Sequence, residues 1–323
     1  MTDKAQAAQA AQGAPRAQAA QDVRQAQDVR ETQDASRARG TRTDQPVLVI
    51  GGTGKTGRRV VDRLREQGVE TRVASRSGAT PFDWDDRGTW DAALEGAAAA
   101  YIVPLDLTPS RTPALVGRAA AAGIGRLVLL SARGVDVPGY FGDSYDGTGP
   151  HLEGELAVRA SGVPWTILRP GWFAQNFSEG VFLDGVTGGE LALPAGDGAA
   201  AFVDADDIAD VAVAALTRPG HEGQVYELSG TRALTVDDAL AEIAKVTGRR
   251  AAYVPVPEQE FRAGLVAQGM APEEAVLWTD AMKPIRTSQE APVVDGVRRA
   301  LGREPRDFGE FVRRAADAGA WTA

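Results

Sequence analysis

The chain has 323 residues, no cysteine, two histidines and a formal net charge of −9. It can therefore form no disulfide, thiol nucleophile or Cys-ligated metal site, and two histidines argue against a His-rich metal centre. The negative charge disfavours a nucleic-acid or anionic-membrane partner. No apolar run approaches the roughly 20 residues that span a bilayer, and no signal-peptide core is present. We expect a cytoplasmic protein that binds no metal and acts on a small molecule; its oligomeric state stays open.

Residues 1–45 differ in composition from the rest of the chain. They are rich in Ala and Gln, contain a short imperfect repeat and almost lack large apolar residues. Such a segment buries too little apolar surface to offset the entropy lost on ordering. We expect a disordered tail, which is either a partner-binding segment or a dispensable extension.

From Pro46 onward, short apolar runs alternate with amphipathic stretches. Uninterrupted apolar runs are typical of strands buried on both faces, and the stretches between them have helical spacing. We expect strands at 47–50, 71–75, 99–103, 126–130 and 165–168, and helices at 55–67, 88–95, 110–122 and 150–161. This alternation predicts an α/β fold with a doubly wound parallel sheet of the Rossmann type.

A glycine-rich turn, VIGGTGKTG at 49–57, follows the first predicted strand. Its Gly-Lys-Thr end resembles an ATP-binding P-loop, but that motif needs a glycine where the chain has Val49. The pattern Gly-x-Gly-x-x-Gly instead fits a dinucleotide-binding turn, in which glycines allow a tight turn and close approach of the pyrophosphate to a helix N-terminus. The expected pyrophosphate-binding residues are Gly51, Gly52, Thr53, Gly54, Lys55, Thr56 and Gly57.

The end of the second predicted strand indicates which dinucleotide is bound. NAD enzymes place an acid there to bind the ribose 2′-hydroxyl, whereas this chain has Ser75, Arg76 and Ser77. Arg76 can bind a 2′-phosphate with its guanidinium, and Ser77 adds a hydroxyl donor. The alternative is an ordinary surface arginine. We expect NADP(H) as the cofactor.

Three later motifs complete a family pattern: Phe82-Asp83-Trp84-Asp85, Thr89-Trp90 and Arg169-Pro170-Gly171-Trp172-Phe173. Together with the glycine turn, they resemble the NmrA-like branch of atypical short-chain dehydrogenases. They are most similar to the agroclavine/festuclavine dehydrogenase subgroup of ergot alkaloid biosynthesis. The resemblance covers residues 46–320 and implies NADP(H), a Rossmann domain at 46–170 and a role in secondary metabolism. It also implies a smaller substrate-binding region at 171–323, some of whose elements return to the Rossmann sheet.

The same resemblance implies roles for individual residues. Asp83 and Trp84 would flank the adenine, Pro104 and Ser131 would follow cofactor-facing strands, and the segment after Pro170 would reach the nicotinamide. From the residues alone, Asp83 is equally suited to a turn or a helix cap.

The chain departs from the family pattern at the proton donor. Ketone-reducing short-chain dehydrogenases usually carry Tyr-x-x-x-Lys, whose lysine lowers the pKa of the tyrosine; no tyrosine here is followed by a lysine four residues later. The candidate catalytic residues are therefore His151, Glu155 and Trp172. His151 is either a substrate contact or an ordinary helix-end residue. Glu155 is a carboxylate that could attract a cation, and Trp172 is an aromatic wall or a core residue.

Three functions remain open. An NADPH-dependent reductase of a conjugated, iminium or quinonoid substrate fits best, because hydride addition to an iminium needs no acid at the reacting carbon. A non-catalytic NADP(H)-binding redox sensor and an isomerase or dehydratase with a retained cofactor are the alternatives. The Asp204/Asp206/Asp207/Asp210 cluster precedes apolar residues at helical spacing, so we expect a helix cap there and no metal site.

Overall fold

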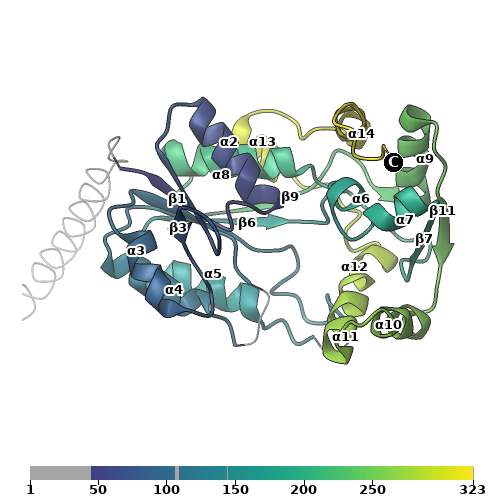
Figure 1. Ribbon diagram of the computed structural model, residues 1–323, viewed down its shortest axis with the longest axis horizontal. Helices are drawn as coiled ribbons and strands as arrows, with labels where there is room; N and C mark the ends of the chain where they lie inside the picture. Colours follow the sequence, from purple (N-terminus) through teal and green to yellow (C-terminus); the bar gives the residue numbers. More distant parts are fainter. Residues whose placement is uncertain (1–44, 106–108, 144, 323) are drawn as a thin grey trace, which may run out of the picture. The chain divides into compact units, whose positions relative to one another are not determined.

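The computed structural model describes residues 45–105, 109–143 and 145–322 (Figure 1). The expected disordered tail at 1–45 lies almost wholly outside the described residues. In the part that the structure describes, no helix combines the length and the apolar character needed to cross a membrane.

Seven parallel strands form the central sheet. Their order across the sheet is β3-β2-β1-β4-β5-β6-β9. From β1 the chain adds β2 and β3 on one side and β4 onward on the other, so the strand order reverses between β1 and β4. This is the expected doubly wound Rossmann-type fold. The strands are β1 (Val47–Ile50), β2 (Thr71–Ser75), β3 (Thr80–Pro81), β4 (Ala99–Ile102), β5 (Leu127–Leu130), β6 (Trp165–Pro170) and β9 (Gln224–Leu228).

Helices cover both faces of this sheet, which explains why its strands are apolar throughout. In β1, Val47 and Val49 pack on one face while Leu48 and Ile50 pack on the other. Figure 1 shows the two helical layers above and below the sheet. One layer contains α2 (Lys55–Glu66), α8 (Ala205–Thr217) and α13 (Gly296–Leu301); the other contains the 3-10 helix Arg87–Thr89, α3 (Trp90–Leu94), α4 (Thr112–Ala121) and α5 (Pro150–Ala160).

A third apolar core lies outside the sheet and is built around Phe177, Phe182, Phe202 and Phe308. We call the segments that surround it, residues 171–200, 234–286 and 308–322, the C-terminal lobe. Between these segments, α8, β9 and α13 return to the sheet. The elements of the lobe are α6 (Asn176–Glu179), α7 (Leu183–Gly188), β7 (Glu190–Leu193), β8 (Ala199–Ala200), β10 (Leu234–Thr235), α9 (Val236–Thr247), β11 (Ala252–Pro255), α10 (Glu258–Ala267), α11 (Pro272–Ala281), α12 (Lys283–Arg286) and α14 (Phe308–Asp317).

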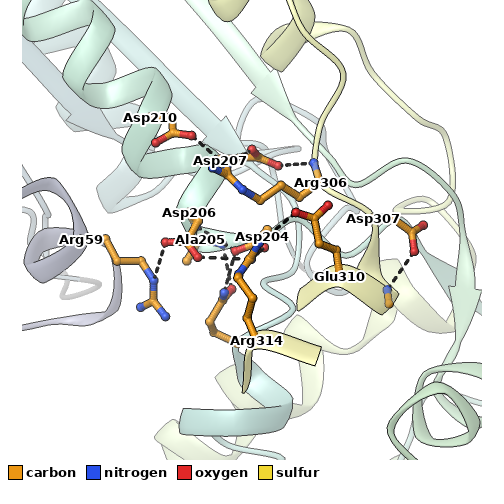
Figure 2. A network of polar contacts seen from close by, with 12 residues as sticks. Arg59, Asp204, Ala205, Asp206, Asp207, Asp210, Arg306, Asp307, Glu310 and Arg314 are labelled. Atoms are coloured by element: carbon orange, nitrogen blue, oxygen red, sulfur yellow. Dashed lines mark hydrogen bonds and ion pairs between the residues drawn. The ribbon is translucent and has the colours of Figure 1, made fainter. Parts of the chain in front are cut away.

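The aspartate cluster at the start of α8 caps that helix, as expected, and also holds distant segments together. Asp204 is the N-cap residue and accepts a hydrogen bond from the backbone of Asp206. Figure 2 shows that α2 and the C-terminal segment both reach this cluster. The guanidinium groups that pair with its carboxylates belong to Arg59, Arg63, Arg303, Arg306 and Arg314.

The start of α2 depends on a close approach that only glycine permits. A Cβ added at Gly57 would lie 2.1 Å from the carbonyl oxygen of Gly51. A real Cβ would therefore push α2 away from the turn that precedes it.

We predict that Gly57→Ala destabilises the protein by roughly 1–3 kcal/mol, the usual range for overpacking, and weakens cofactor binding. Gly117→Ala in α4 is the matched control, because a Cβ at Gly117 meets nothing within 4 Å. Removing a glycine from a helix interior should stabilise the control by about 0.5–1 kcal/mol. Urea unfolding checks both variants, and equal stabilities would refute the steric argument.

Candidate active site

The carboxyl ends of β1, β4, β5 and β6 lie along one edge of the sheet, because these neighbouring strands are parallel. In open α/β sheets ligands bind outside this edge, near the point where the strand order reverses. Here the reversal lies between β1 and β4. The glycine turn follows β1, Pro104 follows β4, and Ser131 follows β5 directly. The candidate site is therefore built from these connections.

The glycine turn has the shape of a phosphate cradle. Gly51 adopts a left-handed φ of 77°, and its carbonyl accepts a hydrogen bond of 3.0 Å from the backbone of Gly54. Thr53 and Gly54 are exposed, whereas Thr56 is buried under the start of α2. No side chain caps α2, and its first turn contains no acid. Its free N–H groups and helix dipole thus fit a pyrophosphate.

Lys55 links the start of α2 to the C-terminal lobe. Its ammonium donates a hydrogen bond of 2.6 Å to Oδ1 of Asn176 in α6. Glu179 in α6 pairs with both Arg58 and Arg59. Burial, and then the charges of Arg58 and Arg59, lower the pKa of Lys55 from its usual value. The contact with Asn176 is a link that the sequence motif alone did not predict.

At the end of β2, Arg76 and Ser77 are exposed. Among the described residues, Arg76 has no hydrogen-bond or ion-pair partner, so its guanidinium is available to a ligand. A surface groove of about 730 Å³ runs along β2 and α2; Thr53, Ser75 and Gly78 are among its lining residues, and Arg76 is not. The exposed, unpaired guanidinium of Arg76 is therefore the feature here that fits an adenosine 2′-phosphate.

Trp84 and Asp83 differ in how much surface they offer. Trp84 is only 8% exposed and packs edge-on against Phe82 and Trp90. The backbone carbonyl of Asp83 accepts a hydrogen bond of 2.8 Å from the Trp90 indole, and its side chain accepts one from the backbone of Asp85. Trp84 thus offers little surface to an adenine ring, and Asp83 forms the turn that its residue type also suggested.

Glu155 is fully buried. It therefore cannot contact a substrate cation directly, whereas we expected a carboxylate that could attract one. Its carboxylate accepts a hydrogen bond of 2.7 Å from the hydroxyl of Ser131. It also accepts two bonds of 2.7 Å each from the guanidinium of Arg169. Burial alone would lower the pKa of Arg169, but the contacts with Glu155 and Asp136 raise it above its usual value. Glu155 also lies beyond the first turn of α5, whose only acid is Glu153.

Two tyrosines of the connection between β5 and α5 also donate hydrogen bonds to acceptors within the protein. Tyr140 donates a hydrogen bond of 2.6 Å to the buried carboxylate of Glu290, and Tyr145 donates one to the backbone carbonyl of Val135. Burial, followed by the charge of Glu290, raises the pKa of Tyr140; burial and then the charge of Asp146 raise that of Tyr145. Neither hydroxyl is the acidified donor that ketone reduction requires.

The remaining candidate residues are His151, Pro104 and Trp172. His151 is the second residue of α5, as its sequence context predicted. Pro104 is partly buried. Trp172 follows β6, stacks on Phe182 with ring centroids 5.6 Å apart, and packs against the core of the C-terminal lobe. Trp172 therefore joins the end of β6 to that lobe and keeps part of its surface exposed.

Comparison with known proteins shows the family. Residues 51–219 match the model of the NAD(P)H-binding family. The chain is 35% identical over 286 residues to the (4-alkanoyl-5-oxo-2,5-dihydrofuran-3-yl)methyl phosphate reductase of Streptomyces griseus, covering 84% of this chain and 98% of the relative. It is 32% identical over 285 residues to the agroclavine dehydrogenase of Claviceps fusiformis, covering 82% and 96%.

A solved structure supports the fold. The NADPH complex of the NADPH-dependent quinone oxidoreductase from Escherichia coli matches with a TM-score of 0.70 at 23% identity, covering 83% of this chain and 99% of that one. The chain therefore belongs to the NAD(P)H-binding, NmrA-like family of oxidoreductases.

Proposed function

We propose that this protein is an NADPH-dependent reductase of a small conjugated, iminium or quinonoid acceptor. The observation that carries this proposal is that three hydroxyl groups beside the candidate site already donate hydrogen bonds within the protein. Ser131, Tyr140 and Tyr145 each donate to an acceptor inside the protein. Thr148, the other described hydroxyl residue between β5 and α5, donates to the side chain of Asp146.

The chemistry follows from this arrangement. Hydride addition to a ketone creates an alkoxide, which needs a proton or a strong hydrogen-bond donor as its charge develops. Hydride addition to an iminium gives a neutral amine, and a conjugated or quinonoid acceptor spreads the charge over several atoms. A site whose hydroxyls donate internally therefore suits these acceptors better than an isolated ketone. The bound cofactor supplies the hydride.

The chain's own residues would orient the two reactants. The glycine turn and the start of α2 bind the pyrophosphate, while Arg76 binds the 2′-phosphate. Trp172, partly exposed at the end of β6, offers an aromatic face to a flat acceptor. The relatives include a dihydrofuranone reductase, a clavine dehydrogenase and a quinone oxidoreductase, and their names support a conjugated or cyclic acceptor. A place in secondary metabolism is part of the same proposal.

We predict that Arg76→Ala weakens NADPH binding by roughly 1.5–3 kcal/mol, the range for charge-assisted hydrogen bonds, and leaves NADH binding nearly unchanged. Arg250→Ala is a matched control, because Arg250 is equally exposed but lies after α9. Fluorescence titration with both cofactors checks the prediction. Equal losses for NADPH and NADH would refute the 2′-phosphate contact.

The substrate class is tested by single-turnover oxidation of bound NADPH, followed by absorbance. A cyclic iminium, a benzoquinone and an unactivated ketone are each mixed with the same complex. We expect the iminium or the quinone to oxidise NADPH at least about tenfold faster than the ketone. Fast reduction of the ketone, with the other two acceptors inert, would contradict the proposal and would require a proton donor outside the three hydroxyls.

A further inference from the structure

The buried pair of Glu155 and Arg169 joins three parts of the candidate site. Glu155 is 0% exposed and Arg169 only 7%. Arg169 belongs to β6 and Glu155 to α5, while Ser131, which donates to the same carboxylate, follows β5. The opposite side of the guanidinium donates a bond of 2.8 Å to Asp136 in the connection between β5 and α5. The pair therefore joins the ends of β5 and β6, helix α5 and the loop that contains Asp136.

No side chain caps the first turn of α5. Its N-cap residue is Gly149, with a left-handed φ of 139°, and its local start signals are Pro150 at the first position and Glu153 in the first turn. A helix start without a capping side chain relies on tertiary contacts for its position. Glu155 provides such a contact one turn after His151, and residues four apart share a face of a helix. His151 therefore lies on the same face of α5 as Glu155, which anchors the helix.

The hydrogen-bond geometry makes this anchor rigid. Both oxygens of Glu155 accept from the forked guanidinium of Arg169, and such paired bonds fix orientation as well as distance. A third donor, Arg159, lies 3.4 Å from Oε2. A lysine at position 169 would keep the charge but could not make the two parallel bonds. The substitution Arg169→Lys therefore keeps the positive charge of the ion pair but removes its two parallel hydrogen bonds.

We propose that Arg169 and Glu155 are positioning residues of the reduction site. They hold the His151 turn of α5 and the end of β5 against β6, and so set the geometry in which cofactor and acceptor meet. This inference rests on the proposed function for its rate readout, although its structural readout does not. In a well-aligned site, a displacement of about 1 Å can cost roughly a hundredfold in rate.

The test compares Arg169→Lys and Glu155→Gln with a control of similar burial. Asp207→Asn is that control: Asp207 is also 0% exposed and pairs with Arg303 and Arg306, but it lies in α8. We expect single-turnover rates to fall by about tenfold to a hundredfold in the two site variants, with NADPH affinity changed less than about twofold. The control should lose stability while its rate stays near that of the wild type.

A second readout follows His151 directly. The chain has only two histidines, so in untagged protein a His221→Asn variant assigns both imidazole proton NMR signals. We expect the His151 signal to move in Arg169→Lys and Glu155→Gln and to stay in place in Asp207→Asn. If both site variants fail to fold, Asp136→Asn replaces them, because the Asp136 side chain is 48% exposed and contacts the outer side of Arg169.

Each result decides one of the two proposals. An unmoved His151 signal together with an unchanged rate in a folded site variant overturns the positioning role, as does an equal rate loss in Asp207→Asn. A wild-type protein that oxidises NADPH with none of the three acceptors overturns the proposed function. The NMR comparison still decides the positioning role in that case.

Discussion

The arginine–aspartate contacts at the start of α8 hold α2 and the last segment of the chain against this helix. Four carboxylates from the N-cap and first two turns of α8 meet guanidinium groups from α2 and from the last segment of the chain (Figure 2). Burial would raise the pKa values of Asp206 and Asp210, but contacts with Arg63 and other arginines lower both. A group with a lowered folded-state pKa stabilises the fold above its unfolded pKa, about 3.9, and loses this effect as the pH falls through its folded value. This part of the stability is therefore present at neutral pH and lost in acid.

The position of α2 connects this network to the cofactor site. We propose that its first turn receives the pyrophosphate; on the same helix, Arg59 and Arg63 contact the aspartates of α8. Lys55 and Arg59 also contact α6 at the base of the C-terminal lobe. Helix α2 thus contacts both α8, where the chain returns to the sheet, and the C-terminal lobe. On the other face of the sheet, the ion pair of Arg169 and Glu155 holds α5 against β6.

The sequence predicted the elements well because their signals are local. Every expected strand and helix of the Rossmann sheet is present, and the helix after the glycine turn ends before Gly68. The burial of Glu155 could not be predicted, because its partner Arg169 lies on β6 and helical spacing says nothing about such a contact. The burial of Trp84 likewise depends on contacts with Trp90 and Phe82, which its motif does not show. The arginines of 303–314 could not be paired with α8 for the same reason, since about a hundred residues separate them.

We propose that this site transfers hydride without a proton from a protein hydroxyl. Isotope effects on single-turnover oxidation of bound NADPH by an N-alkylated cyclic iminium test it most directly. Deuterium at the transferred position of the cofactor should slow the reaction, whereas replacing H₂O by D₂O should leave the rate almost unchanged. A large solvent isotope effect that disappears in Tyr140→Phe or Tyr145→Phe would show that a tyrosine proton moves with the hydride, and would contradict the account.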